Sequence, residues 1–249
     1  MFKKIGVQLF TIRDYMKTPE DVRESFKKLK AMGIDQAQTA GCQISYEEFG
    51  KIAEEEGIEI IGTHENFKLM VEDFEQSFKN HEYLNINSKI MGTGGFFPKT
   101  MEEVEQFLID VNTVTEKAAS KGFKFSYHNH SHEFVRRENG KTIFEMLLES
   151  YKGTYCLDTY WVQHGGGDVR HWIEKLAGKI DILHLKDMAK NNETQFITEV
   201  GNGNLYWEGI LKTAEETGIT YYVIEQDICP GDPFESLKQS VDYLQKFLK

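Results

Sequence analysis

The sequence predicts a single α/β domain over residues 1–249, folded as a (β/α)8 TIM barrel, and three observations support this fold. Short stretches with the composition of β-strands alternate with longer stretches whose apolar residues recur at helical spacing. Eight such units fit into 249 residues, which is the usual size of this barrel. No linker, low-complexity segment or shift in composition divides the chain. The alternative is an open doubly wound sheet, which is disfavoured because no GxGxxG turn follows Gln8-Leu9-Phe10-Thr11.

The eight strand–helix units follow one another along the chain. The predicted strands span residues 4–10, 35–40, 59–64, 88–92, 123–130, 154–160, 180–187 and 221–227. The predicted helices span residues 18–32, 45–56, 69–84, 100–121, 142–150, 168–177, 205–217 and 232–248. Thr18 and Pro19 form a typical helix start, and glycine follows several of the helices, as Gly33 follows the first. The longest irregular stretch, residues 188–204, lies at the C-terminal face of the barrel, where we expect it to act as a lid or substrate loop.

The composition excludes several classes of protein. The chain has 29 Lys+Arg and 40 Asp+Glu, a net charge of −11, which disfavours nucleic-acid and membrane-surface binding and a strongly anionic substrate. No run of eighteen apolar residues is present, and the start of the chain runs directly into a strand pattern, so neither a membrane span nor a signal peptide is expected. Three cysteines without metal-type spacing favour a reduced, cytoplasmic protein.

Polar side chains fall on the inner face of the predicted barrel. Because alternate residues of a strand share a face, the apolar Leu183 and Leu185 should face the helices. This places Ile182, His184 and Lys186 inside. The same alternation places inside Gln8, Ile60, Gly62, His64, Ser126, His128, His130, Cys156, Asp158, Tyr160, Val223, Glu225 and Asp227. Many of these residues are close to the C-terminal ends of the strands, where active sites of this fold are built.

This inward group is typical of a divalent metal site. It contains His128, His130, Asp158, His184 and Glu225, with Glu133 just after the fifth strand. Buried polar groups are costly unless they pair or bind a ligand, and imidazoles with carboxylates suit Mn, Co, Mg or Zn. A single histidine at a strand end is more often a core residue than a ligand, so the prediction depends on four consecutive strands contributing together. The remaining histidines are expected at the surface or behind the site: His81, His132, His164 and His171.

Several motifs resemble those of the xylose-isomerase-like TIM barrels. This superfamily of sugar isomerases and epimerases also includes endonuclease IV and inosose dehydratase. The sequence is most similar to the branch of sugar phosphate isomerases/epimerases, and the resemblance covers nearly the whole chain. The motifs that carry it are Gly6-Val7-Gln8-Leu9, Tyr127-His128-Asn129-His130 with Glu133-Phe134, Leu157-Asp158-Thr159-Tyr160-Trp161, Leu183-His184-Leu185-Lys186-Asp187, Glu199-Val200-Gly201-Asn202-Gly203 and Val223-Ile224-Glu225-Gln226-Asp227.

The resemblance implies one bound divalent metal ion. In the family's epimerases, which include the ketose 3-epimerases, Glu, Asp, His and Glu from four consecutive strands hold the ion. Asp158, His184 and Glu225 match the last three ligands. The first position departs from the pattern, because the aligned residue is His128, and Glu133 is the alternative that would supply a carboxylate.

The resemblance also implies a reaction, in which a proton is abstracted next to a carbonyl of a sugar. The metal ion would act as a Lewis acid, and His130 or Glu225 would act as the base. Lys186 would serve as an acid or electrostatic stabiliser with a pKa lowered by desolvation, or would form a structural ion pair with Asp187 or Glu225. The residues expected to bind the substrate are Gln8, His64, His128, Tyr160 and Trp161, with Phe10 as a further aromatic at the barrel mouth.

The sequence leaves open which product forms. Return of the proton to the same carbon gives an epimerase, return to the next carbon gives an isomerase, and loss of a β-substituent gives a lyase or dehydratase. Two other classes are a nuclease like endonuclease IV, which the acidity of the chain disfavours, and a metal-free barrel that only binds a ligand. The expected partner is a small carbohydrate, and the oligomeric state is left open.

Overall fold

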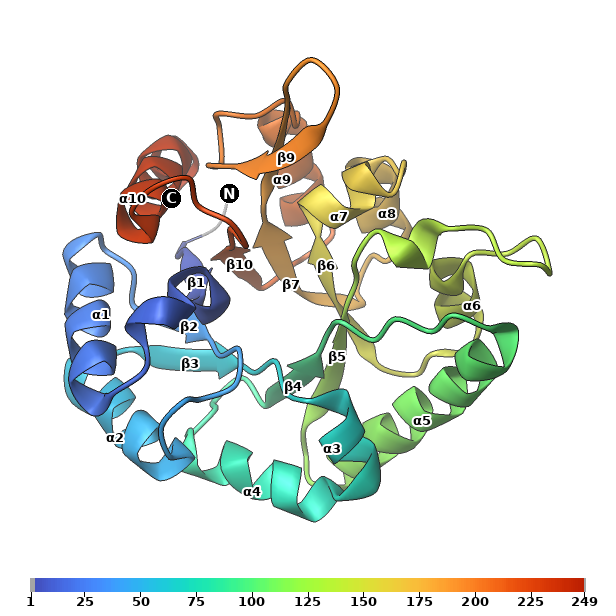
Figure 1. The fold of residues 1–249 in the computed structure, drawn as a ribbon, viewed down its shortest axis with the longest axis horizontal. Coiled ribbons are helices and arrows are strands. Elements are labelled where there is room, and N and C mark those ends of the chain that lie inside the picture. Colours follow the sequence, from blue (N-terminus) through green and yellow to red (C-terminus); the bar gives the residue numbers. More distant parts are fainter. Residues whose placement is uncertain (1–2, 249) are drawn as a thin grey trace.

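Eight parallel strands form the centre of the molecule in residues 3–248, the part of the chain that this computed structural model describes (Figure 1). Their order is β3-β2-β1-β10-β7-β6-β5-β4. The strands are β1 Gly6–Gln8, β2 Gln36–Gln38, β3 Glu59–Gly62, β4 Ile90–Thr93, β5 Lys124–His128, β6 Thr154–Asp158, β7 Ile180–Leu185 and β10 Tyr221–Ile224. The outermost strands meet where the Glu65 N–H, just after β3, donates to the Gly92 carbonyl of β4 at 2.9 Å. The predicted TIM barrel is therefore confirmed.

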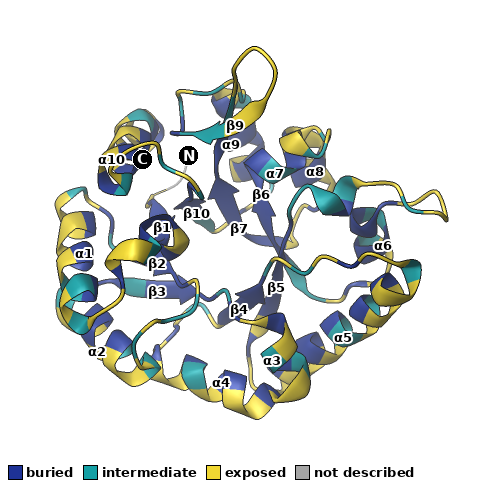
Figure 2. Cartoon of the chain, viewed as in Figure 1, coloured by how far each residue is buried: buried dark blue, intermediate teal, exposed yellow. Residues whose placement is uncertain are grey.

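Helices surround the barrel (Figure 1). They are α1 Pro19–Ala31, α2 Tyr46–Glu56, α3 Phe67–Glu72, α4 Phe74–Tyr83, α5 Met101–Ser120, α6 Ile143–Ser150, α7 Thr159–His164, α8 Val169–Lys175, α9 Trp207–Glu216 and α10 Pro233–Leu244. Three capping boxes begin α1, α5 and α6, where Thr18, Thr100 and Thr142 accept a backbone N–H while an acidic side chain returns the bond. The helices bury one face against the strands and expose the other (Figure 2).

The apolar residues of the strands form two layers. The inner layer fills the barrel with Ile61, Ile90, Cys156, Ile182 and Val223. Leu183 and Leu185 belong to the outer layer, which packs between strands and helices, as the alternation predicts. In the third strand Gly62 and His64 face inward as predicted, but Ile60 does not, because the register between β2 and β3 shifts at Ala37/Gln38. Ile60 consequently joins the outer layer and Ile61 the inner one.

Local side-chain hydrogen bonds shorten several predicted elements. The first strand ends at Gln8, whose side-chain oxygen accepts the Phe10 N–H and begins a 3-10 helix, Leu9–Tyr15. The predicted helix 69–84 is two helices, because Asp73 leaves helical geometry and caps α4. Asp158 likewise ends β6 and caps α7, so Tyr160 lies on a helix and not on the strand. Such caps depend on one hydrogen bond, which hydrophobic periodicity does not report.

The predicted irregular stretch 188–204 contains an ordered hairpin. Its strands are β8 Asp187–Lys190 and β9 Gln195–Thr198, which pair in antiparallel fashion. The buried Asp187 carboxylate accepts hydrogen bonds from the indole of Trp207 at 2.6 Å and from four backbone N–H groups, those of Met188, Gly201, Gly203 and Leu205. A single carboxylate thus holds both ends of the segment to the barrel.

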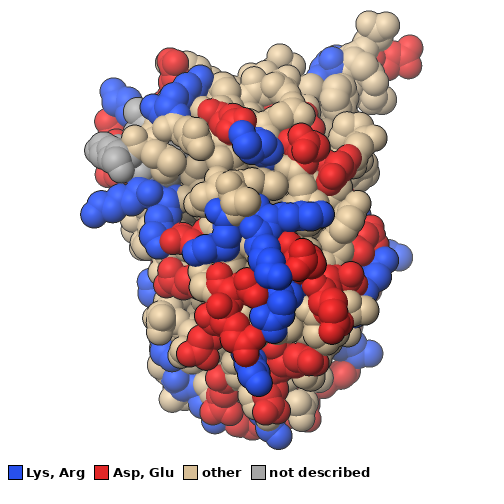
Figure 3. All heavy atoms as spheres, turned by 90° about the vertical axis from the view of Figure 1, so that its left-hand side faces the viewer, with Lys and Arg blue, Asp and Glu red and all other residues tan. Residues whose placement is uncertain are grey.

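The surface around α1 and α2 carries both signs of charge (Figure 3). Arg23 of α1 contacts Glu55 and Glu56 of α2 at 2.7 Å each. Within the described residues, this side of the molecule therefore has acidic and basic groups intermixed, without the continuous positive surface that nucleic-acid binding requires. Among residues 3–248, no helix has both the length and the apolar character needed to cross a membrane.

Candidate active site

Four ionisable side chains meet at the C-terminal end of the barrel. His128 ends β5, Asp158 ends β6, His184 lies in β7, and Glu225 directly follows β10. All four are buried, and one nitrogen or oxygen from each lies within 4.8 Å of the others. The His184 Nδ1 atom is 2.9 Å from Glu225 Oε2 and 3.7 Å from Asp158 Oδ2. The His128 Nε2 atom is 3.3 Å from Asp158 Oδ2.

Neighbouring residues fix the orientation of this group. The Nε2–H of His184 donates to the Gln38 side-chain oxygen at 2.6 Å, which leaves Nδ1 facing the carboxylates. Asp158 uses Oδ1 to accept the Trp161 N–H at 2.8 Å, so that Oδ2 remains for the site. A Cβ atom at Gly94 would lie 2.6 Å from His128 Nδ1, so the glycine makes room for the imidazole.

Lys186 lies fully buried beside these carboxylates. Its Nζ atom is 2.9 Å from both Asp158 Oδ2 and Glu225 Oε2, and 3.2 Å from Asp227 Oδ2. Burial opposes the charge of Lys186, but the three carboxylates raise its pKa. The expectation of a lowered pKa is therefore wrong, because strand alternation indicates burial but does not indicate the three nearby carboxylates. The ion pair expected with Glu225 is present, whereas Asp187 binds the hairpin instead.

The residues present fit a divalent cation. When the histidines are neutral, as metal binding requires, the three carboxylates and one ammonium leave two formal negative charges. His184 Nδ1 is buried and faces the carboxylates, 2.9 Å from Glu225 Oε2 and 3.7 Å from Asp158 Oδ2. Burial disfavours charge on His184, yet Cys156, Glu225 and Asp158 raise its pKa well above the ordinary value. Imidazole nitrogens and carboxylate oxygens together are typical ligands of Mn, Co or Zn.

Glu133 does not lie in this group. The 3-10 turn His132–Phe134 carries its carboxylate behind β5, where it accepts the Tyr127 hydroxyl at 2.7 Å and the His130 N–H at 2.8 Å. Burial raises the pKa of Glu133 to about 8. The prediction that Glu133 lies with Asp158, His184 and Glu225 is therefore corrected, and His128, the other candidate from the sequence, lies with them instead.

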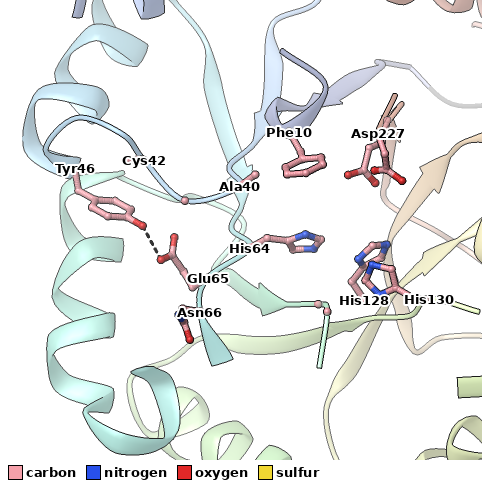
Figure 4. A pocket seen from close by; sticks show the side chains of 14 residues that line it. Phe10, Ala40, Cys42, Tyr46, His64, Glu65, Asn66, His128, His130 and Asp227 are labelled. Atoms are coloured by element: carbon pink, nitrogen blue, oxygen red, sulfur yellow. Dashed lines mark hydrogen bonds between the residues drawn. The ribbon is translucent and has the colours of Figure 1, made fainter. Parts of the chain in front are cut away.

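A cavity of about 480 Å³ opens beside the group (Figure 4). His64, His128 and His130 line it, together with Phe10 and Glu225. Three other predicted substrate-binding residues are not part of its lining. Gln8 is buried beneath it, with Nε2 3.3 Å from His64 Nδ1. Tyr160 is buried and stacks on His164, and Trp161 lies above Lys186, with Nζ 5.5 Å from its ring.

Two groups in this region differ in their ability to exchange protons. Burial lowers the pKa of His130 to about 2, so the imidazole is neutral and weakly basic. Burial raises the pKa of Asp227 to about 6, against the opposing effect of Lys186. Asp227 lines the cavity, and its side chain is 22% exposed. Strand alternation predicted that Asp227 faces inward, but the sequence analysis gave it no role. Its position two residues after Glu225, on the same face, was the observation that could have suggested one.

The remaining histidines have different surroundings. His164 and His171 are exposed and His132 is partly buried, as expected. His81 was expected at the surface or behind the site, but it is a buried structural residue. Its Nδ1–H donates to the Ser77 carbonyl at 2.9 Å, and Nε2 accepts the Thr63 hydroxyl at 2.7 Å. Burial lowers the pKa of His81 to about 4.

Solved structures with the same fold include several sugar-modifying proteins. A sugar phosphate isomerase/epimerase from Parabacteroides distasonis ATCC 8503 is 22% identical with a TM-score of 0.81, over 100% of this chain and 96% of that chain. An L-ribulose 3-epimerase is 12% identical with a TM-score of 0.75, over 99% of this chain and 95% of that chain. The apo form of a 3-keto-D-glucoside 4-epimerase from E. coli is 16% identical with a TM-score of 0.71, over 98% and 99%. At these identities the likeness shows the fold alone. Comparison with curated proteins gave no match.

The family itself is identified by the sequence. The family model described as the xylose isomerase-like TIM barrel matches residues 14–247. The matched span includes His128, Asp158, His184 and Glu225, and it agrees with the eight-stranded barrel. The resemblance expected from the motifs is thereby confirmed. The chain belongs to the xylose isomerase-like TIM barrel family.

Proposed function

We propose that the protein is a sugar isomerase or epimerase that uses one divalent metal ion, held by His128, Asp158, His184 and Glu225. The observation that carries the proposal is the convergence of four buried nitrogen and oxygen ligands from β5, β6, β7 and β10. The orientation of His184, whose Nδ1 atom faces the Asp158 and Glu225 carboxylates, supports it. Mn, Co, Mg and Zn are the candidate ions.

When bound, the ion would act as a Lewis acid that polarises the sugar carbonyl and makes the neighbouring C–H more acidic. Lys186 keeps its positive charge between Asp158, Glu225 and Asp227. Its ammonium therefore holds these carboxylates in place and stabilises negative charge that develops on the substrate. Of the two roles expected for Lys186, acid or electrostatic stabiliser, we propose the second.

We assign the proton transfer to the carboxylates that follow β10. Glu225 and Asp227 both line the cavity, whereas His130 is too weak a base at a pKa of about 2. Glu225 is buried and bound by both His184 Nδ1 and Lys186 Nζ at 2.9 Å, whereas the Asp227 side chain is 22% exposed and contacts Lys186 at 3.2 Å. Asp227 is therefore the carboxylate more free to take and return a proton.

The test combines metal analysis with proton exchange. The purified protein, loaded in turn with Mn, Co, Mg or Zn, is incubated with 2-keto and 3-keto sugars in D2O and followed by NMR. We expect deuterium at one carbon next to the carbonyl and loss of the exchange with EDTA or in Asp227→Asn. Elimination of a β-substituent would identify a lyase. Absence of exchange with every metal and ketose would refute the proposed function, and absence of metal binding would favour a barrel that only binds a ligand.

A further inference from the structure

The cavity has a second polar end, remote from the metal ligands. Tyr46 and Glu65 lie on one side of it, His128 and Asp227 lie on the other, and His64 lies between them (Figure 4). Glu65 follows β3, and its backbone N–H is bound to Gly92 in β4. Its side chain is therefore positioned by the barrel itself, unlike side chains on free loops.

Only one of the two carboxyl oxygens of Glu65 has a hydrogen-bond partner. Tyr46, the first residue of α2, donates its hydroxyl to Glu65 Oε2 at 2.6 Å. Glu65 Oε1 is buried and has no hydrogen-bond partner, and the residue is 9% exposed. A buried carboxyl oxygen without a partner costs free energy, which a ligand hydroxyl would recover. Burial raises the pKa of Glu65 to about 7, which is consistent with a group that lacks a cationic partner.

The charge at the Glu65 end of the cavity selects against an anionic ligand. Lys186 balances Glu225 and Asp227 at the opposite end, whereas neither lysine nor arginine is among the described lining residues to balance Glu65. A phosphate group at the Glu65 end would lie against a carboxyl group with no cation to balance it. A neutral hydroxyl would instead donate to Glu65 Oε1. The volume of about 480 Å³ accommodates a monosaccharide or a small glycoside.

We propose that Glu65, held by Tyr46, is a specificity-determining residue that binds a hydroxyl group of an unphosphorylated sugar and excludes the phosphorylated form. The inference rests on the proposed function for the sugar as ligand and for the reacting end at Glu225. It adds which sugars the cavity admits and which residue at the opposite end selects them.

The test measures the binding of paired ketoses to the manganese-loaded protein by titration calorimetry at pH 8, where Glu65 is mostly ionised. The pairs are D-fructose with fructose 6-phosphate and D-xylulose with xylulose 5-phosphate, supplemented by monodeoxy analogues of the neutral sugar that binds best. We expect the neutral member of each pair to bind at least about tenfold more tightly. Glu65→Ala should weaken binding of the neutral sugar by about ten- to a hundredfold, the effect of losing one hydrogen bond to a carboxylate.

Three further variants make the result specific. Glu65→Gln keeps a hydrogen-bond acceptor but removes the charge. It should therefore bind the neutral sugar as the wild type does and show a smaller preference for the neutral sugar over the phosphorylated one. Tyr46→Phe should weaken the binding of the neutral sugar less than Glu65→Ala does, because it removes the hydrogen bond that holds the carboxylate but keeps the carboxylate itself. Glu48→Gln, an exposed glutamate in the first turn of α2, is the matched control and should bind like the wild type. One deoxy analogue should lose affinity in the wild type but lose none further in Glu65→Ala.

Three results would overturn the inference. They are equal or tighter binding of the phosphorylated sugars, binding of no neutral ketose, and additive losses of affinity for every deoxy analogue in Glu65→Ala. If Glu65→Ala does not fold, as judged by its thermal unfolding, Glu65→Gln and Tyr46→Phe decide. Deuterium exchange on the same samples separates the two proposals. Selective binding without exchange would refute the proposed function and leave this inference standing, whereas exchange without selectivity would do the reverse.

Discussion

The side-chain oxygen of Gln38 accepts a 2.6 Å hydrogen bond from Nε2 of His184, across 146 positions of sequence. This contact decides which ring nitrogen of His184 faces Asp158 and Glu225. A metal ligand whose other nitrogen is bound in this way keeps a single orientation and greater basicity.

We therefore expect Gln38→Ala to weaken metal binding by roughly ten- to a hundredfold, the usual effect of removing such a partner. The measurement is a calorimetric titration of the metal-free protein with Mn²⁺. Gln36→Ala is the matched control, because Gln36 lies in the same strand but binds Glu59 at the other end. Equal affinity in the wild type and Gln38→Ala would show that Gln38 does not orient the ligand.

Substitutions of the proposed ligands should remove the metal and the activity together. Glu225→Gln, His184→Ala and His128→Ala each delete one donor atom from the group, and we expect elemental analysis to find background metal with the barrel still folded. Glu133→Gln should retain full metal, because its carboxylate binds Tyr127 and His130 instead. Full occupancy in His128→Ala together with loss in Glu133→Gln would reverse the assignment.

His81 should make the protein less stable in acid. Its pKa is about 4 in the folded protein, against 6.5 for an imidazole in water, so the unfolded chain binds the extra proton first. The contribution of the neutral His81 to the free energy of unfolding is complete above pH 6.5. It is lost as the pH falls towards 4, and the total change is about 3 kcal/mol. Urea unfolding of the wild type and His81→Gln between pH 4 and 7 measures this difference.

The difference between the two proteins should change with pH in that window alone. His171→Gln, which removes an exposed histidine, serves as the control and should follow the wild type. A constant difference between the wild type and His81→Gln over the whole range would contradict the assignment of His81 as a buried neutral residue.

The hairpin should depend on the charge of Asp187. In Asp187→Asn the amide NH2 would face donors such as Gly201 N–H and the Trp207 indole, which the carboxylate now accepts. We expect residues 187–205 to open more easily by roughly 2 kcal/mol, with the barrel strands unchanged. Hydrogen exchange by mass spectrometry resolves this segment from the rest. Uniform exchange in both proteins would show that other contacts hold the hairpin.

The inward residues of β6, β7 and β10 could be predicted because two-residue periodicity and strand ends are properties of the sequence. Asp158, His184 and Glu225 meet for that reason. Glu133 could not be placed, because its position depends on a 3-10 turn and on the Tyr127 hydroxyl. The pKa of Lys186 was predicted in the wrong direction, since burial is suggested by the pattern but three carboxylates within 3.2 Å are not.

Gln38 and Glu65 were missed for different reasons. The strand β2 is only three residues long and has a weak β pattern, so its polar residues gave no reason to look for a site. Glu65 lies beyond the end of β3, where alternation no longer defines a face. Its importance depends on the distance to Tyr46 and on an oxygen that lacks a partner, and both are properties of the folded chain.

The hydrogen bond from the Glu65 N–H to the Gly92 carbonyl links the stability of the barrel to the cavity. The described strands β3 and β4 end the sheet order and form no ladder with each other, so this bond crosses the seam of the cylinder. Glu65 contributes its backbone to the seam and its side chain to the cavity. A sugar bound by that side chain would therefore stabilise the junction between β3 and β4. Slower hydrogen exchange of the Glu65 amide would then report that the sugar is bound in the cavity.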